Sequence, residues 1–407
     1  MNRDEATKVL EEHGQSHIMK GFDDLSLKEQ EHLLEQVEAI DWDVLALIGQ
    51  EAVEEEKTYE PLNAVKIAEI DKRREEFTEE GIKAIREGKL GAVLLAGGMG
   101  TRLGLDKPKG ELNVGINREL CIFNCLINNL LEVTDGADAY IPLYIMTSEK
   151  NNDETIRFFE EKNYFGYPKD YVNFFVQEMA PAVDYNGKLL LEAPGCLATS
   201  PNGNGGWFTS LAKAGLLEDV NKRGVEWLNI FAVDNVLQRI GDPAFFGATL
   251  LSGTDSGSKV VHKVDAYEKM GVLCQANGHP CIVEYYELTK DMAEAVDDTG
   301  DYLFAFGVIL NYIFKVSKLT EIMNDKMPVH VVEKKIPYID DEGNKVNPTE
   351  PNGYKFETLA VDMVAMMDDS VPYEVVREKE FAPIKNLHGV DSLDSARELL
   401  RANGVEL

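Results

Sequence analysis

Short apolar runs alternate with helix-like stretches from residue 91 onward, and this alternation limits the possible folds more than any other feature of the chain. The apolar runs, typical of buried strands, are GAVLLAG at 91–97, IPLYIMTS at 141–148, VNFFVQ at 172–177 and WLNIFAVDN at 227–235. The stretches with helical spacing include ELCIFNCLINNLLEV at 119–133 and NDETIRFFEEKN at 152–163. Strands that alternate with helices form a mostly parallel sheet covered on both faces. The sequence therefore predicts a doubly wound, Rossmann-like α/β fold.

The flanking regions follow other patterns. Residues 1–88 contain helical patterns and no strand pattern, so we expect a helical N-terminal extension over 1–88 and one main domain over 89–407. Later apolar stretches are shorter and more alternating, which predicts antiparallel additions to the sheet. These stretches are KVVHKV at 259–264, GVLCQ at 271–275 and IVEYYEL at 282–288.

The overall charge excludes one broad class of function. A net charge of −31 argues against a general nucleic-acid binder, although one local basic pocket can still hold a small anion. The sequence has no signal peptide and no apolar run of about 18 residues, so we expect no membrane insertion and a cytoplasmic location. The five cysteines match no zinc-site spacing, and we expect buried, reduced thiols.

A glycine-rich segment, LAGGMGTRLGLDKPKGEL at 95–112, directly follows the first predicted strand. Ligands of open α/β sheets bind beyond the carboxyl ends of the strands, where this segment lies. Bare glycines let backbone N–H groups approach phosphate oxygens, and Arg102 and Lys109 can add charge-assisted hydrogen bonds. The P-loop spacing is absent, and the dinucleotide fingerprint fails because three residues separate Gly100 from Gly104. The segment predicts a polyphosphate site, with a structural turn as the alternative.

The whole segment resembles the signature of nucleotidyltransferases that join a nucleoside triphosphate to a sugar 1-phosphate. The resemblance is to the eukaryotic-type UDP-sugar pyrophosphorylases, and within them to the UDP-N-acetylglucosamine pyrophosphorylase branch. Motifs of that family recur in order along nearly the whole chain: QEMAPAVDYNGKLLLE, SPNGNGGWFTSL, NIFAVDNVLQRIGDPAFFG, CIVEYYEL, HVVEKKIPYID, EPNGYKF and REKEFAPIKN. The resemblance implies that residues 89–407 form a GT-A-like nucleotidyltransferase domain.

The resemblance also implies a reaction. UTP and N-acetylglucosamine 1-phosphate would give UDP-N-acetylglucosamine and pyrophosphate, by in-line attack on the α-phosphorus with Mg²⁺ and without an enzyme nucleophile. Glucose 1-phosphate or galactose 1-phosphate is the alternative substrate. A second alternative is a nucleotide-sugar binding protein that has lost catalysis.

The resemblance assigns roles to individual residues. Nucleotide contacts are expected from Leu95, Ala96, Gly97, Gly98, Lys109, Gln177 and Gly203. Catalytic charges are expected from Arg102, Lys109 and Lys385, and sugar contacts from Asn204, Gly271 and Glu284. Asp234 is the expected Mg²⁺ ligand, with Asp362 as a possible second one. The structural alternatives are a surface ion pair for Arg102, a helix cap for Asp234 and a core amide for Gln177.

Three positions depart from the N-acetylglucosamine pattern, and all three belong to the expected sugar pocket. Val308 stands in place of an asparagine, and Leu359 and Val361 stand in place of two phenylalanines. The transfer chemistry is therefore better supported than the identity of the sugar. Larger relatives continue into a C-terminal β-rich domain, whereas this sequence ends at Leu407, so a monomer is compatible with the sequence.

Overall fold

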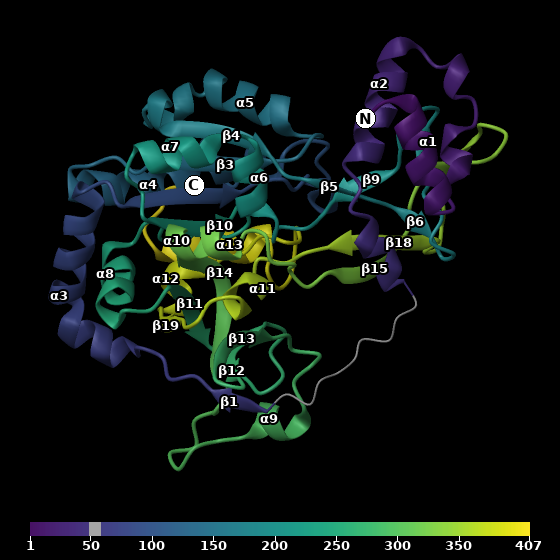
Figure 1. The fold of residues 1–407 in the computed structure, drawn as a ribbon. Helices are drawn as coiled ribbons and strands as arrows, with labels where there is room; N and C mark the ends of the chain where they lie inside the picture. The colour runs from purple at the N-terminus through teal and green to yellow at the C-terminus, as the bar shows by residue number, and fades with distance from the viewer. Residues whose placement is uncertain (49–57) are drawn as a thin grey trace. The chain divides into compact units, whose positions relative to one another are not determined.

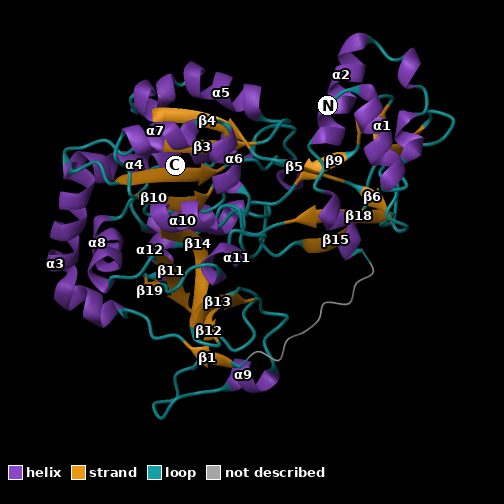
Figure 2. Ribbon diagram, in the orientation of Figure 1, coloured by secondary structure: helices purple, strands orange, loops and turns teal. Residues whose placement is uncertain are grey.

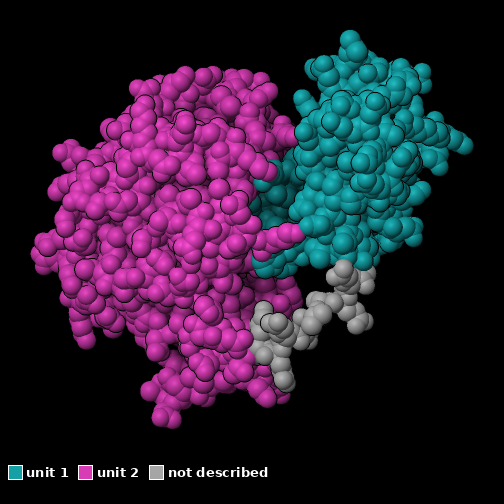
Figure 3. Space-filling view, viewed as in Figure 1, with its two compact units in different colours: residues 1–55, 178–206, 327–359 teal, residues 56–177, 207–326, 360–407 magenta. Residues whose placement is uncertain are grey.

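The computed structural model describes residues 1–48 and 58–407 and divides them into two compact units (Figure 3). The large unit contains residues 58–177, 207–326 and 360–407, and the small unit contains residues 1–48, 178–206 and 327–359. Among the described residues, no helix is long and apolar enough to cross a membrane.

The large unit is built on one twisted sheet whose central strands are parallel (Figure 2). The parallel strands are β2 (Leu90–Leu95), β3 (Leu143–Thr147), β4 (Val172–Val176) and β10 (Trp227–Ala232), in the spatial order β10-β2-β3-β4. The helices that follow or precede them are α4 (Ile122–Ala137), α5 (Asn152–Glu161), α6 (Trp207–Lys213), α7 (Leu216–Lys222) and α8 (Pro243–Ser252). The predicted doubly wound α/β fold is confirmed.

Antiparallel strands extend this sheet on one side, as predicted. The central one is β14 (Phe306–Lys315), which pairs with β10 and with β11 (Ser256–His262). The others are β12 (Val272–Ala276), β13 (His279–Val283) and β19 (Val371–Glu374), the last of which runs parallel to β11. The strand expected over 282–288 ends at Val283, so Glu284 lies beyond it.

Helix α3 (Ile67–Arg86) lies beside α8 in the large unit (Figure 1). The two helices approach closely because glycines stand at their contact: a Cβ on Gly81 would overlap the Pro243 carbonyl, and one on Gly247 would overlap the Phe77 carbonyl. The remaining helices of this unit are α9 (Lys290–Glu294), α10 (Val316–Ile322), α11 (Asp362–Ala365), α12 (Arg377–Glu380) and α13 (Leu393–Ala402).

The N-terminal residues are largely helical, as expected, with α1 (Arg3–Glu12), α2 (Leu27–Glu38) and α3. Ser26 begins α2 with a capping box shared with Glu29. One expectation is wrong, because a short strand, β1 (Tyr59–Pro61), interrupts this region and pairs with β12. A three-residue strand is too short to leave a periodic signal. Helices α1 and α2 belong to the small unit and α3 belongs to the large one.

The small unit packs α1 and α2 against short strands. Its core contains Leu10, Leu33, Val37 and Phe356. Its strands are β5 (Met179–Pro181), β6 (Val183–Asp184), β7 (Leu191–Ala193), β8 (Cys196–Leu197), β9 (Thr199–Pro201), β15 (His330–Lys334), β16 (Tyr338–Ile339), β17 (Lys345–Val346) and β18 (Gly353–Glu357).

Candidate active site

The carboxyl ends of the parallel strands bring several predicted residues to one edge of the large sheet. Leu95 pairs with Ala232 and Met146 in register, and Thr147 pairs with Val176. The glycine loop after β2, Gln177 after β4 and Asp234 after β10 therefore leave the sheet at the same edge. This edge is where ligands of open α/β sheets bind.

Backbone and side-chain hydrogen bonds fix the conformation of the glycine loop. The Asn151 amide donates to the Ala96 carbonyl at 2.9 Å, and the Lys109 N–H donates to the Gly98 carbonyl at 3.1 Å. Gly98 is exposed, and a Cβ placed on it would meet no atom within 4 Å. Asn151 was not predicted, because an asparagine before a helix is usually read as a cap.

Gln177 lies directly against the glycine loop. Its side chain is 6 % exposed, and a Cβ on Gly97 would overlap its amide nitrogen. The Gln177 N–H donates to the Thr147 carbonyl at 2.9 Å and continues the ladder between β3 and β4. The buried environment fits a core amide, and the position beside Gly97 fits the predicted nucleotide contact.

Four predicted charged residues influence one another at this edge. The Lys109 Nζ lies 3.8 Å from Oδ2 of Asp234, with 17 % and 25 % of the two side chains exposed. Burial lowers the pKa of Lys109. The Asp234 charge opposes this shift, and the positive charges of Lys385 and Arg102 add to it. The charges of Arg102 and Lys385 are therefore close enough to Lys109 to influence its pKa.

The structural alternatives for two of these residues are not observed. The N-cap of α8, the helix after β10, is Asp242 and not Asp234. Arg102 is exposed and takes part in no ion pair of the part of the chain that the structure describes.

The segment that carries Lys385 is bonded to the residues after β10, while the Lys385 ammonium itself pairs with Oδ2 of Asp391 at 2.9 Å. The Ile384 N–H donates to the Asp234 carbonyl at 2.9 Å. Asn235, which is 2 % exposed, donates to the Glu380 carbonyl at 2.7 Å and accepts from the Ala382 N–H at 2.9 Å. Asn235 is a positioning residue that sequence reasoning missed. The signal that could have identified Asn235 is its position in FAVDN, directly after the predicted metal ligand Asp234.

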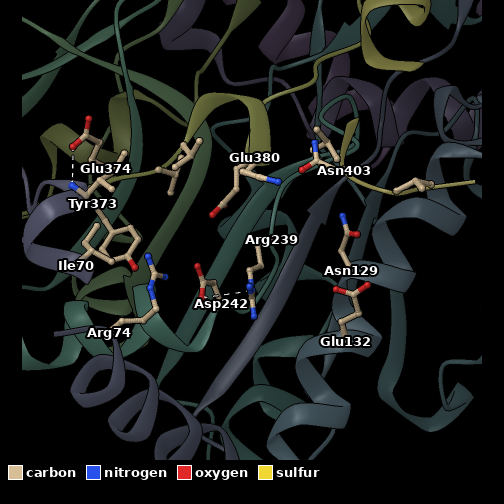
Figure 4. Close-up of a pocket in the computed structure, with 16 residues that line it drawn as sticks. Ile70, Arg74, Asn129, Glu132, Arg239, Asp242, Tyr373, Glu374, Glu380 and Asn403 are labelled. Carbon is tan, nitrogen blue, oxygen red and sulfur yellow. Dashed lines mark hydrogen bonds and ion pairs between the residues drawn. The ribbon is translucent and has the colours of Figure 1, made fainter. Parts of the chain in front are cut away.

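A buried ionic cluster connects the segment after β10, which contains Asp242, with the segment before Lys385, which contains Glu380. The Lys259 side chain is fully buried, and its Nζ donates to Oδ2 of Asp242 at 3.0 Å and also to Oε2 of Glu380. Asp242 and Glu380 also line a cavity of about 380 Å³, together with Arg74, Asn129 and other residues (Figure 4). No predicted site residue lines this cavity.

The predicted sugar residues Gly271 and Glu284 meet at the open end of the β12–β13 hairpin. A Cβ on Gly271 would lie 3.2 Å from Oε1 of Glu284, and the Gly271 carbonyl accepts from the Val308 N–H at 2.9 Å. Helix α11, which begins at Asp362, packs on β13. Burial is the main cause that raises the pKa of the Tyr312 hydroxyl, and the negative charges of Glu284 and Asp362 raise it further.

Gly203 and Asn204 lie in the small unit, in a loop whose backbone is hydrogen-bonded to Thr358. Gly203 has a φ of +87°, which favours glycine, and a Cβ on it would overlap the Thr358 carbonyl. Leu359, one of the three departures from the family pattern, follows Thr358 in the same unit. The glycine is thus required by the local backbone, whatever its role toward a ligand.

A carboxylate and two lysines at this edge have chemistry that suits Mg²⁺ bound together with phosphates. Mg²⁺ binds through one or two carboxylates together with substrate phosphates and water. Asp234 is half-buried at the strand edge and offers one carboxylate, while Lys109 and Lys385 can hold the phosphates that would complete the shell. Among the described residues, no group of three or more histidine, cysteine or acidic side chains could hold a metal. The donor set therefore fits a metal that depends on substrate oxygens.

The fold and the edge site together define the class of nucleotide-binding α/β proteins with a glycine-rich loop after the first strand of the parallel sheet. The chain belongs to the family of UTP–glucose-1-phosphate uridylyltransferases, which matches residues 22–402. A mouse relative, UDP-N-acetylhexosamine pyrophosphorylase-like protein 1, is 35 % identical over 401 residues, covering 93 % of this chain and 79 % of the relative. UDP-N-acetylglucosamine pyrophosphorylase of Saccharomyces cerevisiae is 35 % identical over 405 residues, covering 92 % and 84 %.

Solved structures agree with this assignment. Uridine diphosphate N-acetylglucosamine pyrophosphorylase from Trypanosoma brucei, in complex with an inhibitor, superposes with a TM-score of 0.84 at 28 % identity, covering 99 % of this chain and 85 % of that one. The family resemblance and the nucleotidyltransferase fold expected from the sequence are both confirmed.

Proposed function

We propose that this chain transfers the uridylyl group of UTP to N-acetylglucosamine 1-phosphate, giving UDP-N-acetylglucosamine and pyrophosphate. One observation carries the proposal: in a member of the uridylyltransferase family, Lys109 of the glycine-rich segment lies 3.8 Å from Asp234, and the charges of Arg102 and Lys385 influence its pKa. Several family relatives carry names with this activity.

The nucleotide would bind along the glycine loop. Gly97 and Gly98 can bring their backbone to the uridine. Leu95 ends β2 and Ala96 follows it, both buried, and their contacts with the nucleotide stay predictions. The Gln177 side-chain amide can both donate and accept, which the imide edge of uracil requires. Such a contact would select uracil by hydrogen bonds and not by shape alone.

The chemical step needs charge compensation more than covalent catalysis. Two unit charges about 4 Å apart repel by roughly 4 kcal/mol at an effective dielectric of 20, and several phosphate charges meet here. Lys109 and Lys385 would hold the two phosphates in line, and Arg102 would add positive charge at the rim. Asp234 would hold Mg²⁺, which supplies charge neutralisation at the phosphates when bound. Asp362, placed near Glu284, stays a proposed second acidic partner.

The sugar would lie between the glycine loop edge and the β12–β13 hairpin. The Glu284 carboxylate can accept two hydroxyl hydrogen bonds, and Gly271 allows the sugar to approach its backbone. The roles of Gly203 toward the nucleotide and of Asn204 toward the sugar stay predictions. N-acetylglucosamine is preferred because relatives named for that sugar are 35 % identical to this chain, whereas the solved UDP-glucose pyrophosphorylases are 17–19 % identical.

The test is a pyrophosphate-release assay with UTP and a panel of sugar 1-phosphates. We expect the highest kcat/KM with N-acetylglucosamine 1-phosphate, and dependence on added Mg²⁺. A higher kcat/KM with glucose or galactose 1-phosphate would make that sugar phosphate the preferred substrate, and the proposed uridylyl transfer would still hold. Tight binding of UTP or UDP-sugar without turnover of any sugar phosphate would reject the proposed catalysis. It would favour the alternative, a nucleotide-sugar binding protein.

A further inference from the structure

Two cysteines face each other across the β12–β13 hairpin. The hairpin turns through Asn277 and Gly278, whose φ values of +53° and +85° fit a two-residue turn. In the resulting register Cys274 pairs directly with Cys281, and their Sγ atoms lie 3.4 Å apart. The two sulfurs are thus in contact without being bonded.

Backbone geometry at this pair permits a covalent bond. Directly opposed residues of antiparallel strands have Cα atoms about 4.5–5.5 Å apart. Disulfides span Cα separations of about 4.4–6.8 Å. A small side-chain rotation would therefore join the sulfurs without moving the strands out of register.

The hairpin that carries the pair also carries the proposed sugar contacts. Gly271 directly precedes β12 and Glu284 directly follows β13, so each lies three residues from one of the cysteines. The Glu284 carboxylate lies next to Gly271, since a Cβ placed on this glycine would stand 3.2 Å from Oε1. Any change in hairpin twist would alter the spacing of these two residues.

We propose that Cys274 and Cys281 form a reversible disulfide that adjusts the affinity of the adjoining subsite for the sugar 1-phosphate. The bond itself rests on the hairpin geometry alone, and its effect on substrate rests on the proposed function. The oxidant is a low-molecular-weight disulfide, RSSR.

The exchange proceeds in two balanced steps. The thiolate of Cys281, the half-buried partner, attacks one sulfur of RSSR, which breaks the RS–SR bond and releases RS⁻. The thiolate of Cys274 then attacks the Cys281 sulfur, forms the internal S–S bond and releases a second RS⁻. The two protons of the protein thiols end on the two RSH molecules. The protein is oxidised by two electrons, and RSSR is reduced by two.

The environment of Cys274 fits this order of events. Cys274 is fully buried, and both its hydrogen bond with Cys281 and its burial raise its pKa. Cys274 is therefore a poor first nucleophile. Once Cys281 has become a mixed disulfide, the thiol–thiol hydrogen bond is lost and only burial keeps the pKa of Cys274 raised.

The other three cysteines offer matched comparisons. Cys121 and Cys125 lie at and after the start of α4, both buried, and burial raises the pKa of their thiols to about 11 and about 12. Cys196 is half-buried in the small unit, beside the side chains of His32 and Gln36. We expect Cys196 to form at most an adduct with the oxidant, so Cys196→Ser is a suitable background.

The first experiment detects the bond without using activity. Full-length protein with Cys196→Ser is equilibrated in buffers of oxidised and reduced glutathione, then denatured, alkylated with N-ethylmaleimide and digested. We expect four labels under reduction and two under oxidation, with a peptide linking Cys274 to Cys281. The further variant Cys281→Ser, or Cys281→Ala if the serine variant folds poorly, should keep its three labels. A glutathione adduct on Cys281 without the internal bond, or unchanged labelling, would overturn the proposal.

The second experiment measures what the bond does. In the Cys196→Ser background we expect oxidation to change KM for the sugar 1-phosphate by roughly threefold or more, because a 1 Å misplacement of a positioning group can cost far more than that. KM for UTP should stay the same, and Cys281→Ser should abolish the response. Equal sugar KM values in the oxidised and reduced protein would reject the effect on the subsite. A protein without any transferase activity that still forms the bond would reject the proposed function and not the disulfide.

Discussion

The Lys109 ammonium and the Asp234 carboxylate are neighbours at 3.8 Å, which is beyond hydrogen-bond length. Each charge is thus partly compensated by the other and still has room for a ligand. For the proposed binding of phosphates and Mg²⁺, the pair supplies one positive and one negative group, the first on the glycine-rich segment and the second after β10.

Asp234→Asn keeps the shape of the side chain and removes its charge. We expect kcat to fall by roughly 10²–10³, the scale of losing one electrostatic group at a reacting phosphate, while UTP binding stays measurable by calorimetry. The control is Asp255→Asn, which removes a carboxylate paired with Lys315 elsewhere in the large unit. Wild-type turnover by the Asp234 variant would argue against any role in holding a metal.

Lys109 should set the alkaline limit of activity. Burial lowers its pKa, so it loses its charge at a lower pH than an ordinary lysine, and kcat/KM for UTP should fall as the pH rises through that value. Lys109→Arg should move this fall to higher pH, because a guanidinium stays protonated. Lys109→Ala should weaken UTP use at every pH. A pH–rate profile from neutral to about pH 10 checks both, and identical alkaline limbs would reject the assignment.

Substitutions of the adjacent glycines Gly97 and Gly98 should distinguish an effect on stability from an effect on nucleotide binding. A Cβ on Gly98 would meet no neighbouring atom, so we expect Gly98→Ala to leave the melting temperature unchanged. We expect UTP affinity to fall at least roughly tenfold, because the methyl group would occupy the space proposed for the nucleotide. Gly97→Ala overlaps the Gln177 amide and should lower the melting temperature as well. Calorimetry with UTP and thermal unfolding of both variants make the comparison. Full UTP affinity in the Gly98 variant would move the nucleotide away from this loop.

Gln177 should discriminate between pyrimidines. Gln177→Ala removes an amide matched to the uracil imide, so we expect kcat/KM with UTP to fall while that with CTP changes little. The ratio of the two values is the measurement. An unchanged ratio would return Gln177 to the role of a core amide.

The buried Lys259 should contribute strongly to stability. Lys259→Met leaves Asp242 and Glu380 without their shared cation, and breaking a buried pair in this way costs about 3–5 kcal/mol. Burial raises the pKa of Glu380, so Glu380→Gln should cost less. Urea unfolding followed by tryptophan fluorescence gives both values. Similar losses in the two variants would show that the cluster does not depend on the lysine charge.

Much of the fold was predictable because its signals are local. The buried strands before the glycine loop and before Asp234 are continuous apolar runs. The start of α2 is marked by Ser26, which forms a capping box with Glu29. The contacts that bring Lys385 to Asp234, and Gln177 to Gly97, join distant parts of the chain, and periodicity carries no information about them. The family resemblance supplied those residues, and the structure shows the bonds that hold them. Asn151, Asn235 and Lys259 were missed because each acts through another residue.

The hydrogen bonds from Asn235 to the segment that precedes Lys385 have a consequence for biosynthesis. Asp234 and the glycine loop emerge from the ribosome long before Lys385 does, so a growing chain exposes half of its phosphate site while the other half is still unmade. We therefore expect the site to become competent only after the segment that carries Lys385 has folded back onto the residues that follow β10.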